Sequence, residues 1–233
     1  MVKKKKKTIK KTKKTAKKIA KKAKPSVKKS AAKNTSATQA GAKKSPKKPL
    51  KIQPNLNWTE HSIQDAVATI IQFLRAQNVE AVLVGSACAA IYVPCLSARC
   101  IELVVYEYHV EVMKKLMRRL KFRSTELRLF KSKHAPFDVV FLPPPLEVGD
   151  AAVSEIAEFS NDLCSINLLN HTDCVRHRLA QWYHWGEQSA LDQAVVVSKC
   201  HPKQVNQALI KRWSAHEWAS EKYQQYLDLL SKA

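Results

Sequence analysis

The chain has 233 residues and a formal net charge of +22 at neutral pH. This length is sufficient for a hydrophobic core and favours one folded domain, with or without an appendage. Its apolar runs are too short for a membrane span, which needs about 18 residues, and none follows Met1 as a secretory signal would require. We therefore expect a soluble, intracellular protein without a membrane partner, located in the cytoplasm or on the nucleoid if the source is bacterial.

The positive charge is confined to the first 51 residues. That segment holds 22 of the 41 lysine and arginine residues and none of the 19 acidic residues, so the rest of the chain is neutral. A segment with many like charges and few large apolar side chains cannot offset its ordering entropy by burial. We therefore expect residues 1–56 to form a disordered tail and linker.

The expected partner of this tail is DNA or RNA. Lysines bind backbone phosphates through counterion release and do not read sequence. The repeated KK-T, KK-A and KK-S steps and the quartet SPKK at residues 45–48 resemble the tails of linker histones and of bacterial histone-like proteins. A solubilising or localising tail is the alternative. The lysines assigned to nucleic-acid contact are Lys3, Lys4, Lys5, Lys6, Lys7, Lys13, Lys14, Lys17, Lys18, Lys21, Lys22, Lys47 and Lys48.

After the tail, helices and strands alternate along the chain. Apolar residues at helical spacing predict an amphipathic helix over residues 59–77, with Ser62 and Asp65 near its start as capping residues. The next predicted elements are a strand over 80–84, a Gly-Ser turn, a helix over 87–93, a strand over 100–105, a helix over 109–120, and strands over 126–130 and 137–142. This alternation predicts an α/β (α+β) fold with a mixed sheet and flanking helices.

The C-terminal part is predicted to be helical. One more strand is expected over 163–168, followed by helices over 172–185, 189–199, 202–213 and 215–230. Thr172 and Ser189 suit N-cap positions, and Pro202 suits a first helical turn. The expected organisation is therefore the tail and linker over 1–56, an α/β domain over 57–168 and a helical section over 169–233.

Polar residues inside two predicted strands mark a candidate site. Alternate side chains of a strand share a face, so Cys100 and Glu102 point the same way while the residue between them enters the core. Asp138 lies in a second apolar strand, where a carboxylate is costly unless it has a partner. Two carboxylates beside the helix start at Gly85-Ser86 suit Mg²⁺ and a triphosphate, because carboxylate oxygens ligate the ion and helix N–H groups bind phosphate.

Three segments carry a resemblance to a known family. The segments are VLVGSACA at residues 82–89, SARCIELVV at 97–105 and FDVVFL at 137–142. In this order they resemble the nucleotidyltransferase superfamily of DNA polymerase β, in its minimal and abortive-infection-toxin-like branches. The stretch LNHTDCVRHRLAQWYHW at 169–185 is similar to a segment of uncharacterised bacterial members. The resemblance covers residues 58–202 and leaves the tail unaccounted for.

The resemblance implies roles for individual residues. Gly85 and Ser86 match the phosphate-binding turn of the family. Glu102 and Asp138 match two of its three acids and would ligate Mg²⁺, with Asp138 as general base toward the acceptor hydroxyl. Arg176 and His177 stand where the family has a Lys-Asp pair. Arg176 keeps the positive charge of the lysine and is assigned a catalytic role. His177 replaces the aspartate, so the acidic group is absent.

Cys100 is the main departure, because it occupies the place of the first acid. A thiol is largely protonated near neutral pH, and Mg²⁺ prefers oxygen ligands. We therefore favour a degenerate protein that binds nucleotide or nucleic acid without full transfer activity. One alternative is an active, Mg²⁺-dependent enzyme that moves a nucleoside monophosphate from a nucleoside triphosphate to a hydroxyl of RNA, protein or a small molecule. The other is a histone-like nucleic-acid-binding protein with an unrelated α/β domain.

Two further groups of side chains are expected to be structural. The six cysteines form no C-x-x-C pair and the histidines show no metal-ligand spacing, so buried thiols are predicted. The aromatic residues Trp182, Tyr183 and Trp185 lie at helical spacing, which is typical of a core or an interdomain contact. Stacking of these rings on bases is the alternative.

Overall fold

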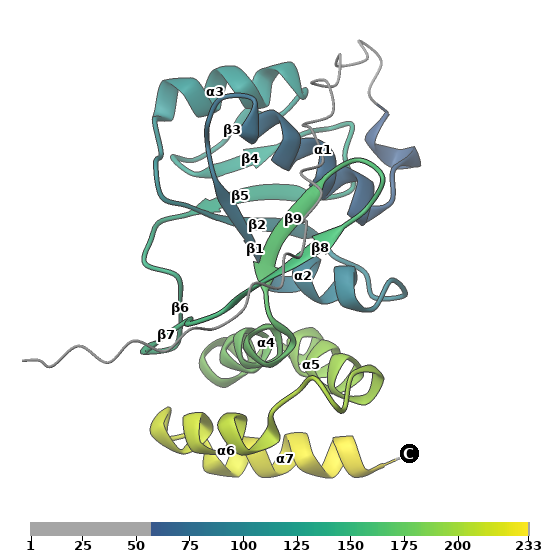
Figure 1. The fold of residues 1–233 in the computed structure, drawn as a ribbon, viewed down its shortest axis with the longest axis vertical. Helices are drawn as coiled ribbons and strands as arrows, with labels where there is room; N and C mark the ends of the chain where they lie inside the picture. The colour runs from purple at the N-terminus through teal and green to yellow at the C-terminus, as the bar shows by residue number, and fades with distance from the viewer. Residues whose placement is uncertain (1–56, 233) are drawn as a thin grey trace, which may run out of the picture. The chain divides into compact units, whose positions relative to one another are not determined.

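The computed structural model describes residues 57–232 (Figure 1). Residues 1–56 and 233 lie outside the described part, and with them the tail lysines that the sequence assigns to nucleic-acid contact. The predicted disorder of the tail therefore stays a prediction, and the fold is that of the chain from residue 57 onward.

A seven-stranded mixed sheet forms the centre of the described part. Its strands are β1 (Ala81–Val84), β2 (Cys100–Val105), β3 (Arg123–Ser124), β4 (Leu129–Lys131), β5 (Asp138–Leu142), β8 (Ile156–Ser160) and β9 (Ser165–Leu169). They lie in the order β3-β4-β5-β2-β1-β9-β8. β2 runs parallel to β5 and antiparallel to β1, and β1 runs parallel to β9. The mixed sheet confirms the predicted fold class.

The described residues form seven α-helices. They are α1 (Ile63–Arg75), α2 (Gly85–Tyr92), α3 (Val110–Arg119), α4 (His171–Trp185), α5 (Gln188–Cys200), α6 (Gln207–His216) and α7 (Ser220–Ser231). α2 contacts both α4 and α5, α4 contacts α6, and α5 contacts α7. Figure 1 accordingly shows α4 and α5 between the sheet and the α6–α7 pair, which confirms the helical C-terminal section. None of these helices has both the length and the apolar character that crossing a membrane requires.

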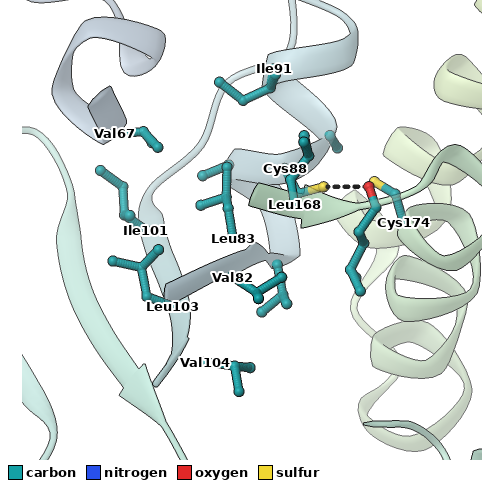
Figure 2. Close-up of a cluster of buried hydrophobic side chains, with 14 of the residues drawn as sticks. Val67, Val82, Leu83, Cys88, Ile91, Ile101, Leu103, Val104, Leu168 and Cys174 are labelled. Atoms are coloured by element: carbon teal, nitrogen blue, oxygen red, sulfur yellow. Dashed lines mark hydrogen bonds between the residues drawn. The ribbon is translucent and has the colours of Figure 1, made fainter. Parts of the chain in front are cut away.

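Buried side chains join the sheet to the helices on either side of it. β1 is buried along its whole length, so both of its faces are covered. Figure 2 shows Val67 of α1, Leu83 of β1 and Ile101 of β2 in this core, and all three are fully buried. In the same cluster the thiol of Cys88 on α2 donates a hydrogen bond to the main-chain oxygen of Leu169 at 3.7 Å. The helix that starts at the candidate site is therefore fixed to the sheet by its buried side.

Helix starts follow local capping chemistry only in part. The hydroxyl of Ser62 accepts a hydrogen bond from the main-chain N–H of Asp65, which confirms Ser62 as the N-cap of α1. The N-cap of α4 is Asn170 and not Thr172, because Asn170 accepts from the main-chain N–H of Asp173. Thr172 instead accepts from the main-chain N–H of Asn206, in the connection between α5 and α6.

Other predicted helix starts are also wrong. α5 begins at Gln188, with Glu187 and not Ser189 at its N-cap, and α7 begins at Ser220 and not at residue 215. The helix after α5 begins at Gln207, not at Pro202, because Asn206 caps it and residues 202–204 form a turn. α2 begins at Gly85 itself, without an intervening Gly-Ser turn, so these two residues form its first helical positions. Because α2 begins at Gly85, the candidate phosphate-binding N–H groups lie at the N-terminal end of this helix.

The short strands near the end of the α/β part were not predicted. β8 alternates between exposed and half-buried residues at an edge of the sheet, and so it lacks the apolar run that marks a central strand. β6 (Glu147–Val148) and β7 (Ala151–Ala152) form a separate two-stranded hairpin that is too short for any periodicity to appear.

The cysteines are less uniformly buried than predicted. All six are free thiols. Cys88 and Cys174 are buried, as expected, whereas Cys95 and Cys200 are exposed. The prediction is wrong for the exposed pair because Cys95 lies in the loop after α2 and Cys200 lies at the end of α5.

Candidate functional site

The start of β2 brings the predicted site residues to one edge of the α/β part. Cys100 pairs in register with Asp138 across the parallel β2–β5 contact, and Glu102 pairs with Val84 of β1. Ile101 is fully buried between the half-buried Cys100 and Glu102, as the strand alternation predicts. The two carboxylates and the thiol therefore lie together where β1 ends and α2 begins.

Gly85 touches the carboxylate of Glu102 directly. Gly85 has a φ of 70°, which is the left-handed region that side chains disfavour. A Cβ at this position would also overlap the Glu102 carboxylate. The hydroxyl of Ser86 donates to the main-chain oxygen of Cys100 at 3.2 Å, so the first turn of α2 is attached to β2. The N-cap residue Val84 provides no side-chain cap, and the first N–H groups of α2 keep their capacity to bind an anion.

Asp138 has a lysine partner that the sequence did not indicate. Lys131 on β4 places its Nζ 3.1 Å from Oδ2 of Asp138. β4 and β5 are antiparallel neighbours, which brings the two side chains to the same edge of the sheet. Both side chains are partly exposed, so the pair adds at most about 1 kcal/mol to stability. Its main consequence is that the charge of Asp138 is locally neutralised.

The charge of a buried arginine acts on Glu102. The side chain of Arg178 on α4 is 2% exposed, and its Nη2 donates to Oε1 of Glu187 at 3.3 Å. Its Nε has no hydrogen-bond partner among the described residues. Burial raises the pKa of Glu102; the positive charge of Arg178 lowers it and the negative charge of Glu187 raises it. Arg178 is therefore the buried cation that acts on the Glu102 carboxylate.

Arg176 does not reach this site. Its Nη1 donates to Oδ1 of Asp173 at 2.6 Å, and both side chains are almost completely buried. Its guanidinium lies 5.0 Å from the centroid of the Trp213 ring. The catalytic role that the resemblance implies for Arg176 therefore stays a prediction, and Arg178 is the α4 arginine whose charge acts on Glu102. Two residues span about 200° of a helix, so only one of the two arginines can face Glu102.

The donor set at this edge does not fit Mg²⁺. Burial, followed by the charges of Glu102 and Asp138, raises the pKa of Cys100 to about 12, so the thiol is neutral at physiological pH. Asp138 is already paired with Lys131, and Mg²⁺ prefers several oxygen ligands in octahedral geometry. Within residues 57–232 no three His, Cys, Asp or Glu side chains converge in a way that would hold a metal ion. We therefore derive no chemical step through a metal here.

His177 stands beside Arg178 and provides a test of this environment. Its Nδ1 is shielded from solvent and has no hydrogen-bond partner in the described part. Burial, with a smaller effect of Arg178, lowers the pKa of His177 to about 4 from the ordinary 6.5. Between these values the unfolded chain binds a proton that the folded chain does not bind, so stability rises with pH across this window.

Replacing His177 with glutamine is expected to reduce the loss of stability in acid. Between pH 7 and pH 5, wild type should lose about 2 kcal/mol more unfolding free energy than His177→Gln, because only wild type takes up this proton on unfolding. Urea unfolding at the two pH values measures the difference. The exposed His134→Gln serves as the control and should match wild type. Equal losses in wild type and His177→Gln would contradict a low pKa for His177.

The fold is similar to that of known nucleotidyltransferase-like proteins. No protein-family description and no curated protein sequence matches the chain. An antigenic nucleotidyltransferase-like protein from Paracoccidioides brasiliensis has 12% identity and a TM-score of 0.50, over 72% of this chain and 92% of that chain. The antibiotic-resistance factor ANT(2'')-Ia has 8% identity and a TM-score of 0.49, over 71% of this chain and 99% of that chain. The first similarity shows a nucleotidyltransferase-like fold, as the three sequence segments indicated.

Proposed function

We propose that this protein binds a nucleoside triphosphate or a nucleic acid on a nucleotidyltransferase-like fold without full transfer activity, and that its lysine-rich tail tethers it to DNA or RNA. The observation that carries the proposal is Cys100. A neutral thiol stands between Glu102 and Asp138 where the resembling family has its first metal-ligating acid. Loss of one ligand of a two-metal site commonly removes several kcal/mol of transition-state stabilisation.

The charges around the site support binding rather than metal-dependent transfer. A two-metal site needs carboxylates that are free to ligate cations. Here Lys131 is paired with Asp138, and the positive charge of Arg178 acts on Glu102. The uncapped first turn of α2 at Gly85 supports binding of an anionic ligand such as a triphosphate.

A transfer assay tests the proposal. Wild type is expected to bind labelled ATP or CTP in equilibrium dialysis and to incorporate neither in the presence of Mg²⁺ or Mn²⁺. Cys100→Asp would place a third carboxylate in register with Asp138, so only this variant is expected to gain incorporation. Cys100→Ser is the matched control, because it changes the thiol without adding a charge.

Two outcomes would contradict the proposal. Incorporation by wild type that Asp138→Ala abolishes would show an active enzyme with a reduced metal site. A wild-type chain that binds no nucleotide and no nucleic acid would favour an unrelated use of the fold. Circular dichroism of each variant verifies that the fold is retained before either outcome is interpreted.

A further inference from the structure

Two of the five tryptophans lie on the surface. Trp185 is 71% exposed and Trp218 is 96% exposed, whereas the remaining three are at most 7% exposed. The prediction that aromatic residues near the end of α4 are structural is correct for Trp182 and Tyr183, which are buried. Trp185 departs from it. Exposed indoles place large apolar faces in water, so these two side chains are free to bind a planar partner.

A side-chain contact joins the two segments that carry these tryptophans. Trp185 is the last residue of α4, and Trp218 follows the end of α6. Next to them in sequence, His184 Nε2 lies 3.2 Å from Glu217 Oε2. Glu217 is itself almost buried, and its Oε1 accepts a hydrogen bond from the main-chain N–H of Asp150 at 3.2 Å. The ends of α4 and α6 are therefore linked, and the indoles flank the link.

The surface beside Trp218 is positively charged. Helix α6 contains no acidic residue, and its exposed side chains include Lys211, Arg212 and His216. Among the described residues neither Lys211 nor Arg212 forms an ion pair with an acidic side chain. Arg212 and His216 are four residues apart and share one face of the helix. The exposed acids nearest along the chain are Glu187, two residues after Trp185, and Glu221, in the first turn of α7.

We propose that this tryptophan surface, formed by Trp185, Trp218, Lys211, Arg212 and His216, binds single-stranded nucleic acid. Bases stack on the two indoles while the α6 cations contact the phosphates. The inference rests on the proposed nucleic-acid tether and deepens it, because stacking adds a preference for single strands that the lysine tail lacks. A surface that binds a protein partner commonly has a contiguous apolar patch, whereas this surface has two single indole rings and cationic side chains.

The salt dependence of the affinity distinguishes base stacking on the tryptophans from electrostatic binding by the lysine tail. The full chain is titrated with fluorescein-labelled oligothymidylate and with a duplex of equal length, at several salt concentrations, by fluorescence anisotropy. Trp185→Ala and Trp218→Ala are each expected to weaken single-strand binding about tenfold, with an unchanged salt slope and unchanged duplex binding. Trp218→Tyr, which keeps an aromatic face, should retain most of the affinity.

The control is Leu127→Ala, which removes another exposed apolar side chain, 62% exposed on the β3–β4 connection. It should bind both probes as wild type does.

The inference is overturned if the double tryptophan variant binds the single strand as tightly as wild type, or loses single-strand and duplex affinity equally. It is also overturned if sedimentation shows that wild type is oligomeric and that the double tryptophan variant is monomeric. The tryptophan surface would then be an interface between copies of the chain. A wild-type chain with duplex affinity and no tryptophan effect refutes this surface alone. A wild-type chain without affinity for either probe refutes the tether as well.

Discussion

Removal of residues 1–51 is expected to reduce the affinity of the protein for duplex DNA about 1,000-fold at 50 mM salt. The deleted segment carries 22 lysines and no acid, and the remaining chain is neutral, so the counterion-release contribution to binding lies in the tail. The full chain should also lose affinity steeply between 50 mM and 200 mM salt, whereas the shortened chain should show a slope near zero. Fluorescence anisotropy of both chains over this salt range measures the two quantities.

A charge-preserving variant controls for the loss of chain length. Replacing the thirteen assigned lysines with arginine keeps the charge and should keep the salt slope, and replacing them with glutamine should reduce it. An unchanged affinity and slope after deletion would show that the tail has a solubilising or localising role and that the tether is wrong.

Replacing Arg176 with methionine is expected to lower the free energy of unfolding by about 3 kcal/mol, because the almost completely buried Asp173 would lose its partner. The same change at Arg178 should instead weaken ATP binding about tenfold, because it removes a buried positive charge that acts on Glu102. Urea unfolding and ATP titration of both variants give the two measurements.

The two arginines are matched controls for each other, since they are two residues apart on α4 and both are buried. Arg176→Met should bind ATP as wild type does at a temperature where it is folded. Arg178→Lys should recover part of the binding. If Arg176→Met loses ATP affinity while Arg178→Met keeps it, the site lies on the other face of α4.

Local pattern was sufficient to predict the strand that carries the site. The alternation of β2, with Ile101 buried between Cys100 and Glu102, follows from the period of a strand and needs no tertiary information. A helix after the apolar strand β1 was also predictable, although it begins at Gly85 and not after a Gly-Ser turn. These features depend on residues close in sequence.

The partners of the site residues were not predictable, because they depend on distant contacts. Lys131 reaches Asp138 only because β4 pairs with β5, and the predicted strand over 126–130 ended one residue before Lys131. The choice between Arg176 and Arg178 depends on the rotation of α4 against α2, which helical periodicity alone leaves open. One local signal was available: Asp173 precedes Arg176 by three residues, a spacing typical of an ion pair within a helix.

The position of β9 has a consequence for folding. Leu83 of the central strand β1 pairs with Leu168, so the sheet closes only when a strand more than eighty residues later has been synthesised. Such a contact slows folding, because the chain loses the entropy of the closed loop before the stabilising contact forms. Until then one edge of β1 is open to pairing with another nascent chain. The tail precedes the sheet along the chain and is synthesised before it, so its 22 positive charges would repel neighbouring copies during that interval. The same lysines that are proposed to bind DNA or RNA would thus protect the unfinished sheet from aggregation.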